Sequence, residues 1–257
     1  MLGQAGDGNT AKEAFDRDGI LVFDPEIPDK TIDRAIADVE LGPRSGWAKR
    51  RRRPTADVGR VTDSWASSPS AKQIALAPAV LELLRALYGR EPHPFQTLNF
   101  KYGTEQRPHA DAVHFNTDPP GFMCGVWVAM EDIDADCGPL VYYPGSHRLP
   151  FASPSEVGID VDPGRQAVSH EEYAAYYEPY IEQLIEREGL QPKYGTLTKG
   201  QAVVWAANLL HGGSPVLTPG RTRRSQVTHY HFEGSRLWTP LLSCGSDIAW
   251  REAPLIA

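Results

Sequence analysis

The sequence predicts a mainly β protein, a β-sandwich or jelly roll flanked by helices, and two observations carry this prediction. After Pro94 the chain consists of short apolar or alternating runs that Gly, Pro and Asp turns separate, as in an antiparallel β fold. The opening third instead has helical periodicity, and such helices need a sheet to pack on. With 257 residues, 41% of them hydrophobic, the chain can bury one sizeable core. We therefore expect residues 1–257 to form a single domain.

Helical patterns dominate the N-terminal part. We expect helices at AKEAFDRDG (11–19), at DKTIDRAIADVE (29–40), which follows Pro28, and at AKQIALAPAVLELLRALYG (71–89). The last of these ends at Gly89, since glycine commonly follows a helix C-terminus. The apolar run ILVF (20–23) predicts one early strand between the first two helices.

The strands of the predicted barrel follow. They are FQTLNFKYG (95–103), GFMCGVWVAME (121–131), PLVYYPG (139–145), YGTLTKG (194–200), AVVWAA (202–207) and SQVTHYHF (225–232). Residues 150–192 interrupt them and carry a predicted helix, HEEYAAYYEPYIEQLIEREG (170–189). An insert of this length is unusual unless it has a function, commonly as a lid over a pocket. Its tyrosines, Tyr173, Tyr176 and Tyr177, either cover a polar, ring-containing substrate or form the inward face of a packed helix.

Charge and composition exclude several classes of partner. A formal net charge of -7 argues against a general nucleic-acid or anionic-membrane binder and favours a small-molecule substrate. The N-terminus MLGQAGDGNT lacks a signal-peptide pattern and no segment has the length of a membrane span, so we expect a cytoplasmic protein, a monomer or a homodimer. Cys124, Cys137 and Cys244 are expected to be reduced core thiols. The basic run Lys49–Arg53 is either a solvated loop or a grip for an anionic substrate group.

The segment HADAVHFNTDPP (109–120) offers two ways to start a metal site. On an extended strand, residues two apart share a face, so His109 and Asp111 converge on one ion without distortion. His114 and Asp118 have a helical spacing, but Asn116 and the Pro119–Pro120 pair disfavour a helix there. Spacing therefore favours the first pair, although a lone His-x-Asp is a weak signal.

A second histidine arrives from a distant run, VVWAANLLHGG (203–213). This apolar stretch delivers His211 at its end, and Gly212 and Gly213 are small enough to allow a close approach to the backbone. Two histidines and one carboxylate form the facial triad of non-heme Fe(II) oxygenases, which leaves three adjacent positions open. A zinc site with a further ligand or one water is the alternative.

Two polar residues downstream suit a dicarboxylate. In RTRRSQVTHY (221–230), Arg223 and Ser225 lie two apart on an expected strand, where they present a cation and a hydroxyl on the same face. Such a pair can hold the far carboxylate of a small diacid.

These segments together resemble the phytanoyl-CoA dioxygenase family of Fe(II)- and 2-oxoglutarate-dependent oxygenases. The resemblance runs from FDRDGILVF (15–23) through HADAVHFNTDPPGFMCGVWVAMEDIDADCGPLVYYPGSHRLP (109–150) and WAANLLHGGSPV (205–216) to RTRRSQVTHYHF (221–232). It implies a double-stranded β-helix, the jelly-roll or cupin-like core, with N-terminal helices and a helical insert. It also implies Fe(II) as cofactor, with 2-oxoglutarate and O2 as co-substrates.

The resemblance assigns roles to individual residues. It makes His109, Asp111 and His211 the iron ligands, so that His114 lies in the pocket wall, and it places Trp127 along the 2-oxoglutarate pocket. Arg223 binds the 5-carboxylate of 2-oxoglutarate, with Arg221 and Arg224 as rivals. One feature departs from some relatives, which have serine two residues after the distal histidine. Gly213 stands there, so that hydrogen bond is absent or comes from Ser214 or Ser225.

The implied reaction is hydroxylation of a small molecule of the secondary-metabolite, sugar or amino-acid type. Succinate and CO2 are released. A carboxylate at Asp111 disfavours halogenation, whereas desaturation, cyclisation and epimerisation stay open. A cupin-like metal-dependent hydrolase or isomerase would use the same three ligands but has no need of Arg223 and Ser225, and a non-catalytic binding module is a further alternative. His147, His229 and His231 are expected to be structural residues.

Overall fold

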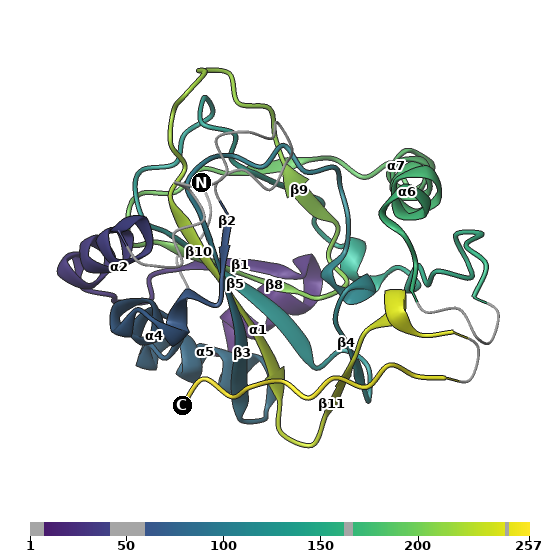
Figure 1. The fold of residues 1–257 in the computed structure, drawn as a ribbon, viewed down its shortest axis with the longest axis horizontal. Coiled ribbons are helices and arrows are strands. Elements are labelled where there is room, and N and C mark those ends of the chain that lie inside the picture. The colour runs from purple at the N-terminus through teal and green to yellow at the C-terminus, as the bar shows by residue number, and fades with distance from the viewer. Residues whose placement is uncertain (1–7, 42–59, 162–166, 245–246) are drawn as a thin grey trace.

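The framework of the computed structural model is a six-stranded antiparallel sheet (Figure 1). The model describes residues 8–41, 60–161, 167–244 and 247–257. In spatial order the strands are β1 (Ile20–Phe23), β8 (Ala202–Ala206), β5 (Met123–Ala129), β10 (Ser225–Phe232), β3 (Pro92–Phe100) and β2 (Arg60–Thr62). A three-stranded sheet contains β7 (Lys193–Gly195), β6 (Leu140–Tyr142) and β9 (His211–Gly213), and β4 (Asn116–Asp118) pairs with β11 (Arg236–Trp238).

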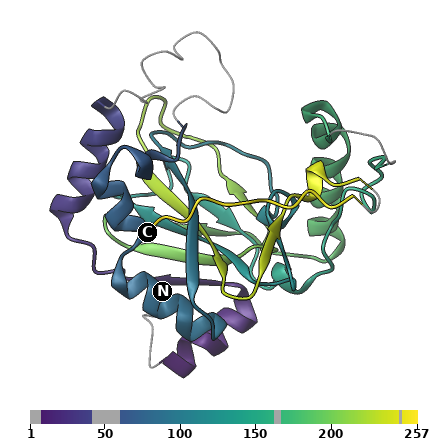
Figure 2. The same ribbon diagram turned by 60° about the horizontal axis from the view of Figure 1, so that its bottom comes forward.

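The N-terminal helices cover one face of the large sheet. They are α1 (Gly8–Asp18), α2 (Asp29–Leu41), α4 (Pro69–Ala75) and α5 (Pro78–Tyr88), and Figure 2 shows them gathered on one side of the strands. Side chains alternate between the faces of a strand, so Cys124, Val126 and Val128 of β5 pack against the helices. The expectation that these helices need a sheet to pack on is confirmed.

The opposite face of the large sheet packs against the small sheet. Trp127 of β5 and Val227 of β10 share a buried cluster with Leu140 and Tyr142 of β6. Two antiparallel sheets that enclose a core between them form the predicted jelly roll, and the fold class is confirmed. The space between the sheets is where a ligand can be enclosed.

The helix expected at 71–89 is two helices. Pro78 lies in the first turn of α5, where its missing N–H costs nothing, but within one continuous helix it would break the hydrogen-bond ladder at Ile74. The predicted end is confirmed, since Gly89 adopts the left-handed conformation with φ 66°.

The helix of the insert is also interrupted. It consists of α6 (His170–Glu172), a π-helical segment η4 (Tyr173–Tyr177) and α7 (Glu178–Arg187). Pro179 lacks an N–H, and in a regular α-helix its ring would clash with a carbonyl of the preceding turn, which accounts for the wider π turn before it. Tyr177, Ile181 and Leu184 are buried in a cluster that also contains Ala110.

Several short elements were not expected from the sequence. Strands β2, β4, β9 and β11 each have three residues, and the strand expected at 194–200 is reduced to β7. Such lengths are too short for a periodic signal. The 3-10 turns are η1 (Ser64–Ala66), η2 (Asp111–Val113), η3 (Ser146–Arg148) and η5 (Pro240–Leu242).

Three smaller expectations can be compared with the structure. All three cysteines are buried thiols that form no disulfide, as expected. Within the described ranges, no helix has both the length and the apolar character needed to cross a bilayer. The basic run Lys49–Arg53 lies outside the described residues.

Candidate metal centre and cofactor pocket

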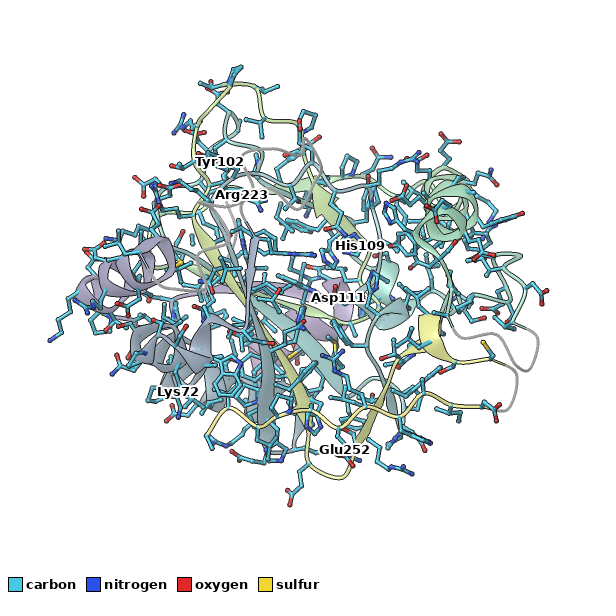
Figure 3. The ribbon with its side chains drawn as sticks, viewed as in Figure 1. Lys72, Tyr102, His109, Asp111, Arg223 and Glu252 are labelled. Carbon is cyan, nitrogen blue, oxygen red and sulfur yellow. The ribbon has the colours of Figure 1, made fainter. Side chains whose placement is uncertain are left out.

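Two histidines and one aspartate meet between the sheets. His109 follows β3, Asp111 begins η2 and His211 begins β9. The backbones of the two histidines pair directly, with N–H to C=O distances of 2.8 and 2.9 Å. One ligand atom from each of the three residues lies within 4.8 Å of the other two, and all three residues are buried. Figure 3 shows His109 and Asp111 inside the fold.

The local backbone differs from the extended strand expected at His109–Asp111. His109 forms only an isolated β-bridge, and Asp111 starts a 3-10 turn. The carbonyl of Asp111 accepts hydrogen bonds from the N–H groups of His114 and Phe115. Ala110 between them is extended, with φ -110° and ψ 137°. Because Ala110 is extended, the side chains of His109 and Asp111 turn to the same side, as their spacing predicted. The expected regular strand is absent at these residues.

Backbone carbonyls orient both histidines. His109 Nδ1 lies 3.0 Å from the carbonyl oxygen of Arg107, and His211 Nδ1 lies 3.0 Å from that of Leu209. A carbonyl only accepts, so Nδ1 carries the proton in each ring and the Nε2 lone pair is available to a metal. Burial and the neighbouring His211 lower the pKa of His109 to about 3, which keeps this imidazole neutral.

The two oxygens of Asp111 have different surroundings. Oδ1 lies 3.9 Å from His109 Nε2 and 3.8 Å from His211 Nε2. Oδ2 accepts a hydrogen bond of 2.8 Å from the indole N–H of Trp205 and lies 3.5 Å from His229 Nε2. Burial alone would raise the pKa of Asp111, but the adjacent histidines hold it well below its usual range. The carboxylate is therefore charged and ready to bind a cation.

A cavity of about 350 Å³ adjoins this cluster. His114 lines it, as expected for a residue of the pocket wall. Asp118 does not line it. That residue is exposed on β4, where it pairs with Arg236 of β11. The structure thus brings together His109, Asp111 and His211 and leaves the rival aspartate outside.

Arg223 lines the same cavity and is labelled with His109 and Asp111 in Figure 3. It is 4% exposed, and burial lowers its pKa to about 10. Its Nη1 donates to the carbonyl oxygen of Gly138 at 3.0 Å, whereas its buried Nε has no partner. Among the described residues no carboxylate forms an ion pair with it, although buried arginines usually have one.

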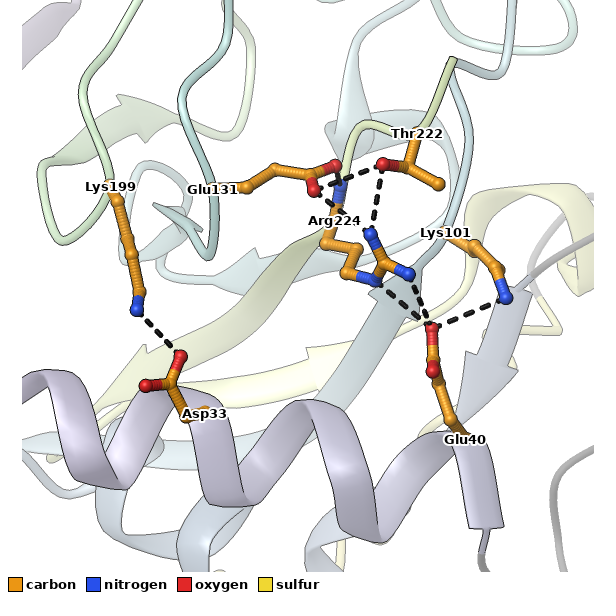
Figure 4. Close-up of polar contacts among 7 residues, drawn as sticks. All are labelled: Asp33, Glu40, Lys101, Glu131, Lys199, Thr222 and Arg224. Carbon is orange, nitrogen blue, oxygen red and sulfur yellow. Dashed lines mark hydrogen bonds and ion pairs between the residues drawn. The ribbon is translucent and has the colours of Figure 1, made fainter. Parts of the chain in front are cut away.

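The rival arginines are engaged elsewhere. Arg221 pairs with Asp134 at the surface. Arg224 lies 2.9 Å from Glu40 and 3.0 Å from Glu131, within the network drawn in Figure 4. Neither arginine lines the cavity.

Ser225 and Trp127 lie near Arg223. Trp127 lines the cavity, and its ring centre is 5.4 Å from the Arg223 guanidinium carbon. Ser225 is the first residue of β10 and not part of the wall, but its fully buried Oγ has no hydrogen-bond partner. Arg223 itself precedes the strand on which it was expected.

The two glycines after His211 accommodate the chain's own backbone. A Cβ on Gly212 would lie 2.6 Å from the carbonyl oxygen of Gln106, and one on Gly213 would lie 2.8 Å from the N–H nitrogen of Glu105. Ser214 donates its hydroxyl to the carbonyl of Pro139 at 2.7 Å. Of the two serines considered as replacements at Gly213, only Ser225 therefore keeps an unengaged hydroxyl.

Sequence reasoning missed two residues of the site, Trp205 and His229. His229 was expected to be structural, yet it faces Asp111. The alternation of β10 could have indicated this position of His229. His229 follows Val227 by two residues and Ser225 by four, so all three side chains lie on the same face of the strand. His147 is a turn residue that contacts the backbone of Asp16, as expected. His231 lies two residues farther along the same face, beside His93, and does not line the cavity.

Comparisons with known proteins agree with this architecture. The model of the family described as "Phytanoyl-CoA dioxygenase (PhyH)" matches residues 15–225. A phytanoyl-CoA dioxygenase domain-containing protein 1 of Mus musculus is 36% identical over 102 residues, 36% of this chain and 35% of that protein, so the match spans about a third of that relative. An ectoine dioxygenase of Sphingopyxis alaskensis is 24% identical over 239 residues, 88% of this chain and 76% of that protein.

Solved structures share the fold. EctD from S. alaskensis superposes with a TM-score of 0.66 and 22% identity, covering 95% of this chain and 84% of that chain. The epimerase SnoN from nogalamycin biosynthesis was solved with Fe3+, alpha ketoglutarate and nogalamycin RO. It superposes with a TM-score of 0.65 and 19% identity, covering 97% of this chain and 98% of that chain. The family model spans helices α2, α4 and α5, the His-x-Asp turn, His211 and Arg223, so this chain belongs to the phytanoyl-CoA dioxygenase family.

Proposed function

We propose that this protein is an Fe(II)- and 2-oxoglutarate-dependent oxygenase that hydroxylates a small molecule. One observation carries the proposal: a buried cluster of two histidines and one carboxylate shares a cavity with a buried arginine that forms no ion pair among the described residues. A metal-dependent hydrolase would use the same metal cluster, but it would need no anionic co-substrate for Arg223 to bind.

The donor set fits iron. In the proposal His109, Asp111 and His211 are the metal ligands, and they supply the facial triad of two imidazole nitrogens and one carboxylate oxygen. Hydrogen bonds at Nδ1 already direct Nε2 of both histidines toward the carboxylate. Gln106 Nε2 lies 3.3 Å from His109 Nε2, a contact that a metal ion would replace.

The unpartnered polar atoms fit 2-oxoglutarate. Arg223 would bind its 5-carboxylate, and the Ser225 hydroxyl would donate a second hydrogen bond. Trp127, Leu140 and Val227 line the cavity and would contact the methylene groups between the carboxylates. Desolvation strengthens the ion pair, because the buried guanidinium has little water to compensate it.

When bound, iron and 2-oxoglutarate would supply the oxidative chemistry, in which O2 is the oxidant and its reduction is balanced by the oxidation of 2-oxoglutarate to succinate and CO2 together with the hydroxylation of the substrate. The chain's own part is positional. It fixes the ligand nitrogens, neutralises the co-substrate's far charge and excludes water from the space between the sheets. Asp111 occupies the third protein position on the metal, which supports hydroxylation over halogenation.

The substrate would lie on the side of His114 and Phe115, which line the same cavity. The insert contributes Tyr173 here. Its ring centre is 5.5 Å from that of His114, and its buried hydroxyl has no partner. Arg107, two residues before His109, forms ion pairs with Glu178 and Glu182 of the insert, with N–O distances of 3.1 and 2.6 Å. We infer that the described residues of the 150–192 insert cover the substrate side.

The type of substrate, a secondary metabolite, a sugar or an amino acid, is part of this proposal. So are a cytoplasmic location and a monomeric or homodimeric state. Solved structures of this fold include an epimerase, a carbocyclase and EctD with 5-hydroxyectoine. Because one fold hosts these reactions, the substrate's placement selects among hydroxylation, desaturation, cyclisation and epimerisation.

Anaerobic titration of the purified apoprotein with Fe(II) and 2-oxoglutarate tests the proposal. We expect the weak visible metal-to-ligand charge-transfer band of the chelate in the unaltered protein. Arg223→Ala should weaken 2-oxoglutarate binding by at least about 100-fold, because a desolvated charge pair is lost. Arg221→Ala is the matched control, since it removes a surface ion pair two residues away and should leave the band unchanged. Absence of the band with tight retention of zinc would support the hydrolase or isomerase instead.

A further inference from the structure

Four residues on neighbouring strands form one row across the inner face of the large sheet. Trp205 of β8 pairs with Gly125 of β5, Gly125 pairs with His229 of β10, and His229 pairs with Gln96 of β3. Residues in one row of a sheet point to the same face. Trp205, His229 and Gln96 all line the cavity beside Asp111.

The row contacts one oxygen of Asp111 and leaves the other free. Trp205 donates to Oδ2 at 2.8 Å, and His229 Nε2 lies 3.5 Å from the same oxygen. Oδ1 instead faces the Nε2 atoms of the two histidine ligands. The carboxylate is thus divided between a metal-facing oxygen and a protein-facing oxygen.

Gly125 gives Trp205 the room to reach Asp111. A Cβ at this position would lie 2.6 Å from two carbons of the indole ring, a distance that real Cβ contacts do not show. With no side chain there, the indole lies across β5 and its N–H reaches the carboxylate. A glycine inside a buried strand usually weakens the strand. At Gly125 this loss of strand stability accompanies the placement of the Trp205 indole beside Asp111.

Gln96 fixes the ring of His229. Its Oε1 lies 3.1 Å from His229 Nδ1, and both side chains are buried. This contact sets the rotation of the imidazole and so directs Nε2 at Asp111. Residues that contact a metal ligand in this way commonly orient the ligand and tune the metal.

We propose that the Trp205–Gly125–His229–Gln96 row limits Asp111 to binding the metal through Oδ1 alone and thereby keeps a coordination position open for 2-oxoglutarate. The inference rests on the proposed function. A carboxylate whose second oxygen is released can take two positions on one ion, and it then competes with a chelating co-substrate for the three that a facial triad leaves. Trp205 and His229 are positioning residues in this account.

Two loss variants and a rescue variant test this role. In Trp205→Phe and His229→Leu, the dissociation constant of 2-oxoglutarate from the Fe(II)-loaded protein, measured anaerobically, should rise by about 10-fold. His229→Gln offers an amide N–H on a side chain of similar reach to Oδ2 of Asp111 and should restore most of the affinity. His231→Leu is the control, since it changes a half-buried histidine two residues farther along the same face of β10 that does not line the cavity.

A second readout concerns the metal alone. Bound Mn(II) enhances water-proton relaxation in proportion to its water ligands, so the enhancement should fall in both loss variants and stay unchanged in His231→Leu. Unchanged relaxation and 2-oxoglutarate affinity in Trp205→Phe and His229→Leu, with only a lower melting temperature, would overturn the inference and leave a packing role. Failure of the unaltered protein to bind 2-oxoglutarate would instead refute the proposed function.

Discussion

The backbone N–H of Ala110 donates to the phenolic oxygen of Tyr177 at 3.3 Å. Ala110 is the residue between the two proposed ligands of the His-x-Asp turn, and Tyr177 ends the π-helical segment of the insert. The same tyrosine stacks on Tyr173 with ring centres 4.9 Å apart. The insert is therefore bonded to the turn that presents the metal ligands.

Loss of this hydroxyl should loosen the turn. Tyr177→Phe keeps the ring in its fully buried place but leaves the Ala110 N–H unpaired, so the free energy of unfolding should fall by about 1 to 2 kcal/mol, measured by urea denaturation. Iron affinity should fall by a few-fold because the turn is less ordered. Tyr176→Phe is the control, since Tyr176 is 49% exposed and should show neither effect.

The two aspartates of residues 109–120 should respond differently to the same change. Asp111→Ala removes the buried carboxylate between the histidines and should abolish Fe(II) binding detectable by equilibrium dialysis. Asp118→Ala alters an exposed strand residue and should leave Fe(II) affinity within about twofold. Comparable losses in both variants would refute the assignment of Asp111 as the ligand.

Ser225 should affect the co-substrate without stabilising the apoprotein. Its buried hydroxyl has no partner, so Ser225→Ala should leave the melting temperature of the apoprotein unchanged or raise it. Its 2-oxoglutarate dissociation constant should rise about fivefold, the equivalent of one lost hydrogen bond of about 1 kcal/mol. A melting temperature that falls with unchanged affinity would show that Ser225 serves packing alone.

The stability of the apoprotein should decrease in acid. The pKa of His109 is lowered from 6.5 to about 3, so below pH 6.5 the unfolded chain binds a proton that the folded chain does not. The stability due to the neutral ring is present above pH 6.5 and is lost as the pH falls toward 3, by about 1.4 kcal/mol per pH unit. Urea denaturation at pH 7.5 and 5.0 should therefore show a smaller decrease for His109→Gln than for the unaltered protein.

The sequence by itself determined the fold class, the N-terminal helices and the chemistry-bearing residues His109, Asp111, His211 and Arg223. Periodicity reports which face of an element is apolar, and the spacing of His109 and Asp111 reflects the local extension of one residue, Ala110. Both are properties of neighbouring residues, so they can be read along the chain. The family resemblance supplied the roles that spacing left open.

Only the tertiary structure decided which groups surround those residues. Arg221, Arg223 and Arg224 are indistinguishable by type, and the burial of one and the ion pairs of the other two depend on distant segments. Trp205 and His229 lie far apart in sequence, yet strand pairing brings both to one carboxylate oxygen of Asp111. Contacts across a sheet follow from register and from the space that Gly125 leaves open, and neither is written in a local pattern.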